Sequence, residues 1–139
     1  MPDLVTHSAT GYLLKKKVFP SQGTYWFVLG CCLPDFLVHI PANLVRLAYS
    51  LMGKIHPYTF LASLNFLHEP LGYGLFCYWI STFFPEKKKL VFWNLLGGGL
   101  FHYLLDFGQR HMEPGYRPLY PLYDKYMELG LYGTETTLY

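Results

Sequence analysis

The sequence predicts an all-α protein, folded as a compact helical bundle that is integrated in a membrane or closely associated with one. Three apolar runs without Asp, Glu, Lys or Arg support this prediction: residues 18–34, 70–85 and 90–105. Hydrophobic residues make up 52% of the chain and aromatic residues 19%, whereas charged residues make up only 14%. Such a composition excludes a disordered chain and is unusual for a small soluble protein.

Chain length, net charge and cysteine spacing further limit the kinds of protein that this sequence could form. A chain of 139 residues is expected to form one domain, residues 1–139. The net charge of +2 is too small to indicate a nucleic-acid binder, and the lysines gather in two compact runs, Lys15–Lys17 and Lys87–Lys89. The cysteines Cys31, Cys32 and Cys77 have no CxxC spacing, so we interpret them as reduced, small apolar residues rather than zinc ligands.

The first expected helix runs from about Asp3 to the Lys15–Lys17 run. Asp3 is a good N-cap, and the lysine charges suit the C-terminus of a helix. After a turn at residues 20–23, a second apolar helix is expected to end at Leu33. The reason is Pro34, which disfavours helical backbone in the residue before it.

A new helical turn is expected from Pro34, which suits the first position of a helix. This turn would carry Asp35 and His39. Pro41 then starts or kinks the next apolar stretch, whose leucines follow helical spacing and which Gly53 closes.

Two longer helices are expected at residues 68–84 and 90–107, after a shorter segment at 54–66. Beyond Gly108 the composition shifts to Pro, Gly and Tyr. We therefore interpret residues 110–139 as an irregular C-terminal segment, with one short amphipathic helix near residues 121–129.

The two longer helices flank the basic loop Lys87–Lys89, as in a helical hairpin. Each apolar run is close to the shortest helix that crosses a membrane, about 17 residues. The hairpin therefore either spans a thin membrane or forms the buried core of a compact helical domain. The aromatic content, the lysines at the run ends and the small residues Gly97–Gly99 favour the membrane, with lipid as partner. The positive-inside rule would place both lysine runs on the cytoplasmic side.

His102 and Asp106 are the most informative residues, because they lie one helical turn apart in the most apolar stretch. On a helix, positions i and i+4 project from the same face. An imidazole and a carboxylate are costly to bury together unless something binds them, and a divalent metal ion binds both well. The alternative is a buried His–Asp hydrogen bond that ties helices together.

Further ligands come from the other apolar segments. In an antiparallel hairpin, His68 lies at a depth similar to that of His102 and Asp106, far from the lysine loop. His7 and Asp35 flank the first lysine run in the same way, at unequal distances. The hairpin spacing therefore permits one shared metal site at the end of the bundle opposite the lysines. The metal ligands we predict are His7, Asp35, His39, His68, His102 and Asp106.

The sequence evidence is weaker for two of the candidate site residues, His39 and Glu69. His39 is one turn after Asp35, although Pro41 follows closely. Glu69 opens a predicted helix and is either a helix-start carboxylate or a catalytic general base. His56 and His111 are interpreted as loop residues.

Several short motifs of this chain occur in the same order as in a known protein family. The motifs are Thr6-His7, Leu33-Pro34-Asp35, His68, the run His102-Tyr103-Leu104-Leu105-Asp106, and Leu119-Tyr120-Pro121. Together they look like the bacterial family of predicted membrane-bound metal-dependent hydrolases, to which the LexA-regulated inner-membrane proteins belong. That family is itself similar in His/Asp order to zinc-dependent phospholipase C. This chain has Leu37 where many relatives carry a second acid, a role that His39 or Glu69 is placed to fill.

The resemblance implies a metal-dependent hydrolase in the bacterial inner membrane. It implies one or two zinc-like ions held by His7, Asp35, His68, His102 and Asp106, and a phosphoester substrate, either a small molecule or a lipid. The alternative is a non-catalytic membrane protein whose His/Asp cluster binds metal structurally or holds the helices together. A bis-His haem protein fits less well, because carboxylates at the same level suit a harder ion.

Overall fold

The computed structural model describes residues 4–18, 22–55, 57, 60, 63–110, 117, 120, 122–123, 125–127 and 129–134. Within these residues the protein is all-α, as the sequence predicts. The elements in chain order are α1 (Leu4–Lys17), α2 (Thr24–Leu51), η1 (Asn65–His68), α4 (Pro70–Ser81), η2 (Pro85–Lys87), α5 (Lys88–Gly108), β1 (Gln109–Arg110) and β2 (Tyr132–Thr134).

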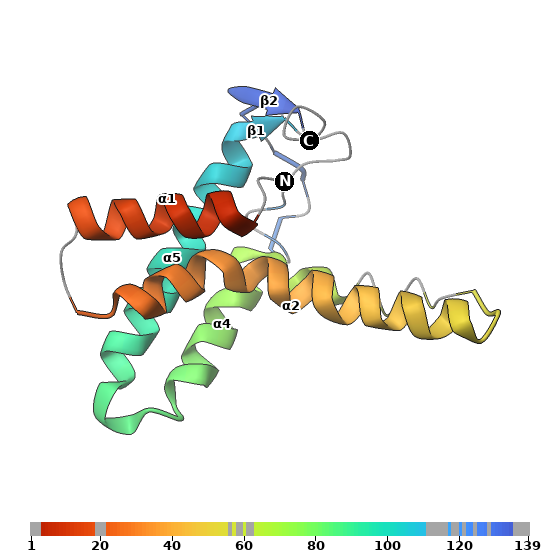
Figure 1. Ribbon diagram of the computed structural model, residues 1–139, viewed down its shortest axis with the longest axis horizontal. Coiled ribbons are helices and arrows are strands. Elements are labelled where there is room, and N and C mark those ends of the chain that lie inside the picture. Colours follow the sequence, from red (N-terminus) through yellow and green to blue (C-terminus); the bar gives the residue numbers. More distant parts are fainter. Residues whose placement is uncertain are drawn as a thin grey trace.

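The helices form two antiparallel pairs that cross. α1 runs back along the first half of α2, and α4 and α5 form a hairpin that packs across them (Figure 1). The most extensive contact is between α2 and α5. The second half of α2 projects well beyond the other helices (Figure 1). Two helical stretches are long and apolar enough to cross a membrane, Thr24–Leu51 and Pro85–Gly108.

α2 is one continuous helix, so the predicted end at Leu33 is wrong, and Pro41 does not start a new helix. Pro34 has no N–H to give to the carbonyl of Gly30, a loss that usually interrupts a helix. Here the hydroxyl of Tyr73 donates to that carbonyl, with an O–O distance of 3.2 Å, and also lies 3.1 Å from the carbonyl oxygen of Leu95. A neighbouring helix therefore replaces the missing backbone donor.

Three further features differ from the sequence-based expectation: the bounds of α4, the structure near residues 121–129, and a pair of short strands. α4 begins at Pro70 and ends at Ser81, so it is shorter than the predicted 68–84, and His68 lies in η1. The predicted short helix near 121–129 is not present in the described residues of that range. Instead, the backbone N–H groups of Leu129 and Leu131 donate to carbonyls at the end of α5, at 2.9 and 2.7 Å. β2 then pairs in parallel with β1, which the sequence did not predict. Asp3, the expected N-cap, lies outside the described residues.

Glycines bring α2 and α5 close together at their crossing. A Cβ added to Gly30 would meet the backbone of Leu95, and one added to Gly98 would meet the backbone of Phe27. This close approach lets the backbone of α2 contact side chains of α5. Next to the crossing, Tyr73, Cys77, Val91, Leu95 and Tyr103 form the buried hydrophobic cluster.

We expect Gly98→Ala to destabilise the protein by about 3 kcal/mol or more, because a methyl group there forces two backbones apart. The measurement is the free energy of unfolding by denaturant in detergent micelles. Gly74→Ala is the matched control, since its added Cβ would meet only Leu96 Cδ1, at 3.8 Å. That variant should be neutral or gain up to about 1 kcal/mol from helix propensity. Equal stability of the two variants would contradict the close crossing.

Candidate metal centre

Four side chains from three segments converge beside the helix crossing. His102 and Asp106 project from one face of α5 and are fully buried. Asp35 comes from the middle of α2, and His68 from the end of η1. One donor atom from each of the four side chains lies within 4.8 Å of the other three donor atoms. Each residue was predicted from the sequence, and this group could hold a metal ion.

The distances join the four donors into one network. His102 Nε2 lies 3.0 Å from Asp106 Oδ2, 3.3 Å from His68 Nε2 and 3.8 Å from Asp35 Oδ1. His68 Nε2 in turn lies 3.2 Å from Asp35 Oδ1. Two imidazole nitrogens and two carboxylates therefore form one largely buried cluster.

A backbone contact orients the ring of His102. Its Nδ1 lies 2.9 Å from the carbonyl oxygen of Cys31, so the Nδ1–H donates to that oxygen. In the neutral ring this leaves the lone pair on Nε2, the atom that faces His68 and the two carboxylates. Ligating histidines typically donate their other ring N–H to a carbonyl or carboxylate in this way. Lone pairs and negative charges that face one another repel unless a cation or a proton lies between them.

His7 contacts Asp106 from α1. Its Nε2 is 3.2 Å from Asp106 Oδ1, whereas His102 contacts the other carboxylate oxygen. The two imidazole rings stack with centroids 4.1 Å apart. His7 is fully buried, and neither ring nitrogen makes a well-directed hydrogen bond within the described part of the chain. The structure therefore brings His7 to the cluster through Asp106 rather than into the four-donor group.

His39 lies at the rim of the cluster. Its side chain is 48% exposed, and its Nε2 is 3.7 Å from Asp35 Oδ1, one turn away on the same helix. It does not belong to the four-donor group. Pro41 does not displace it, because α2 remains helical through that residue.

Glu69, the predicted catalytic base, is buried next to His68 in the chain, and its carboxylate contacts the C-terminal segment. Its Oε1 lies 3.3 Å from Nε of Arg117. The guanidinium group of Arg117 also stacks over Tyr120, 4.3 Å from the ring centroid. This contact ties the C-terminal segment to the start of α4. Nothing in the sequence around Arg117 indicated it.

The C-terminal segment also covers the end of α5 beside Asp106. The hydroxyl of Tyr132 donates to the carbonyl of Leu105, and its ring packs where a side chain on Gly108 would lie. Burial, and then the negative charge of Asp106, raises the pKa of Tyr132. His56, His111, Leu119 and Pro121 lie outside the described residues.

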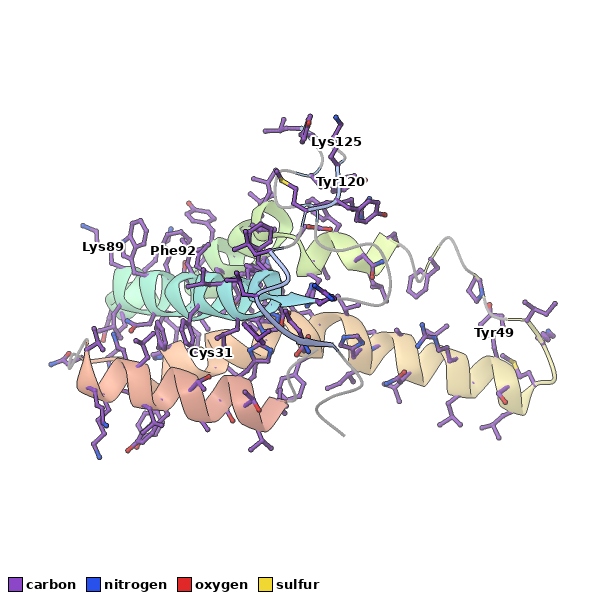
Figure 2. All side chains as sticks on the ribbon, turned by 90° about the horizontal axis from the view of Figure 1, so that it is seen from above. Cys31, Tyr49, Lys89, Phe92, Tyr120 and Lys125 are labelled. Carbon is purple, nitrogen blue, oxygen red and sulfur yellow. The ribbon has the colours of Figure 1, made fainter. Side chains whose placement is uncertain are left out.

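The lysine runs lie away from this cluster. Figure 2 labels Lys89 at one edge of the molecule and Cys31, whose carbonyl contacts His102, near the centre. The end of α1 that carries Lys15–Lys17 is on the same side as the α4–α5 turn (Figure 1). The basic loops and the His/Asp cluster are thus separated along the helices.

Comparison with protein-family models, with curated proteins and with solved structures gives no match for this chain.

Proposed function

We propose that this protein is a membrane-associated, metal-dependent hydrolase that acts on a phosphoester. The observation that carries the proposal is the four-donor group, in which the Cys31 carbonyl orients His102 so that its Nε2 atom faces Asp35, His68 and Asp106. The resemblance to predicted membrane-bound hydrolases supports the same class. The proposal rests on the chemistry of the donors and on that resemblance.

Two nitrogen and two oxygen donors suit a borderline ion, and zinc is our proposal for it. A zinc ion supplies Lewis-acid polarisation of a phosphoryl oxygen and activation of a water nucleophile. His102, His68, Asp35 and Asp106 would hold it, with His7 orienting Asp106 from its second oxygen. Glu69 stays our candidate for the general base, and Arg117, which contacts it, is its positioning partner.

Exposed apolar side chains support placement in a membrane. In the most apolar stretch of α2, only 33% is buried within the structure. In the most apolar stretch of Pro85–Gly108, 39% is buried. The core helix of a soluble protein would bury more of its apolar surface. Large apolar side chains are exposed on every long helix, among them Leu13, Leu29, Leu75, Trp79, Trp93 and Leu104. So many exposed large apolar side chains favour contact with lipid or with another protein.

We propose the bacterial inner membrane as the location, with Lys15–Lys17 and Lys87–Lys89 on the cytoplasmic side. The positive-inside rule and the family resemblance support this orientation. The His/Asp cluster would then be reached from the opposite side or from within the bilayer.

A structural role is the second candidate, and the His7–Asp106–His102 contacts favour it. These three fully buried side chains connect α1 to α5 through the two oxygens of one carboxylate. Such a link would stabilise the helix packing without any catalysis.

The full chain, purified in neutral detergent and loaded with zinc, should bind about one or two equivalents and hydrolyse bis(p-nitrophenyl) phosphate. Chelation should remove both the metal and the activity, and added zinc should restore them. Metal content is measured by elemental analysis, and hydrolysis by nitrophenolate release. Stoichiometric zinc without hydrolysis of this or any lipid phosphodiester would support the structural role. A protein that binds no zinc would contradict the hydrolase proposal and leave the direct link between α1 and α5 as the role of the cluster.

A further inference from the structure

A stripe of polar side chains leads from the metal centre along the projecting half of α2. Asp35, His39 and Arg46 are the only residues among Asp, Glu, His, Lys and Arg in this helix. Asn43 and Ser50 complete the set, and the spacing of the five is four, four, three and four residues. At about 100° per residue, all five therefore lie within roughly a quarter of the helix circumference.

Two pairs of neighbouring side chains in the stripe approach each other. His39 Nε2 lies 3.7 Å from Asp35 Oδ1, and Arg46 Nη1 lies 3.5 Å from Asn43 Oδ1. His39, Asn43, Arg46 and Ser50 are all exposed. The guanidinium group thus lies near the level of Asn43, about 12 Å along the helix from Asp35 at a rise of roughly 1.5 Å per residue.

The neighbouring face of the same helix is apolar. It carries Ile40, Leu44, Leu47 and Leu51, each at least 50% exposed. Tyr49, labelled in Figure 2, marks the far end of this arm. An otherwise apolar helix that places its ionisable residues in one line starting at a buried centre is typical of a substrate path, since such residues are costly in apolar surroundings.

We propose that this stripe binds the part of the substrate that extends away from the scissile bond, and that Arg46 binds a second anionic group of it, a phosphate in chemical class. The inference rests on the proposed function, because it takes the four-donor group as the place where the scissile phosphoester lies. An Arg guanidinium recognises phosphate through paired N–H donors, and Asn43 beside it adds a further polar contact. The substrate is then a phosphoester with two anionic groups separated by about 12 Å.

The test is calorimetric titration of the zinc-loaded full chain in neutral detergent with two probes. One is tetraethylene glycol bearing a phosphate at both ends, and the other is the same glycol with one phosphate. The first probe should bind at least about ten-fold more tightly, as expected for one additional charge-assisted contact. Arg46→Gln should reduce this preference to about the two-fold statistical advantage of a symmetric ligand, with bound zinc unchanged. Lys54→Gln, which removes an exposed charge just beyond α2, should keep the full preference.

Other outcomes separate this inference from the proposed function. Equal affinity of the wild-type protein for the two probes, or a preference that survives Arg46→Gln, would overturn the binding stripe even if bis(p-nitrophenyl) phosphate is hydrolysed. A preference that depends on Arg46 in a protein without hydrolytic activity would uphold the stripe and refute the catalytic proposal. Failure of both probes to bind would refute phosphate recognition altogether.

Discussion

Replacement of His102 by glutamine should leave the purified protein almost free of bound zinc. The Nε2 atom of His102 lies within 3.8 Å of donor atoms from Asp35, His68 and Asp106, so it is the atom shared by the whole group. Glutamine keeps an amide that is able to donate to the Cys31 carbonyl, but its oxygen is a poor zinc ligand. The affinity for zinc should fall by more than the roughly 10–100-fold that loss of an outer-shell partner costs.

His39→Gln is the matched control for this experiment. It makes the same chemical change at a half-exposed side chain, whose Nε2 lies 3.7 Å from Asp35 Oδ1 and which is not part of the four-donor group. We expect that variant to retain most of its zinc. The measurement is elemental analysis of both proteins after dialysis against a weak chelator, with circular dichroism to show that both are folded. Equal losses in the two variants would mean that His39 is as much a ligand as His102.

The sequence was sufficient to predict the helix that carries His102 and Asp106, and the four residues of the donor group are among the six predicted ligands. The spacing of His102 and Asp106 placed them on one face of a helix, and the antiparallel hairpin placed His68 at the same level. What it could not predict depends on contacts between segments far apart in the chain. The hydroxyl of Tyr73 donates to the Gly30 carbonyl, and this contact replaces the backbone donor that Pro34 lacks.

Contacts between distant segments also explain the other differences between the predicted and the observed structure. The Cys31 carbonyl orients His102, yet a backbone atom leaves no mark in the sequence. The pairing of residues 129–134 with the end of α5 overrides the amphipathic pattern near 121–129. Glu69 opens a predicted helix, and its contact with Arg117 comes from a segment whose path the composition does not indicate. Helical periodicity therefore predicts which face a residue occupies, but not which partner it contacts.

Asp106→Asn should abolish the stabilisation of the protein by zinc while the helices still pack. Asparagine has nearly the same shape as aspartate, but it lacks the negative charge that offsets the charge of the ion. In the wild-type protein, zinc at about 1,000 times its dissociation constant should add about 4 kcal/mol to the free energy of unfolding. This appears as a rise in the melting temperature on addition of zinc, and the rise should be close to zero in the variant.

Asp35→Asn offers a parallel test, because the two carboxylates belong to one donor group. If both act on one ion, the double variant should lose little zinc affinity beyond either single variant, since residues that act as a unit are not additive. Purely structural hydrogen bonds would behave differently. Each asparagine would then cost about 0.5–1.5 kcal/mol in stability, and this cost would be the same with and without zinc.

The melting temperature and zinc content of folded Asp106→Asn protein decide between a metal centre and a structural link. Asp106 contacts both His7 and His102, at 3.2 and 3.0 Å, and an asparagine oxygen is able to accept one of those two contacts. The link between α1 and α5 would therefore survive in part whichever role Asp106 has, whereas zinc binding depends on the charge. Full zinc occupancy in the variant would show that His102 and Asp106 only hold the helices together.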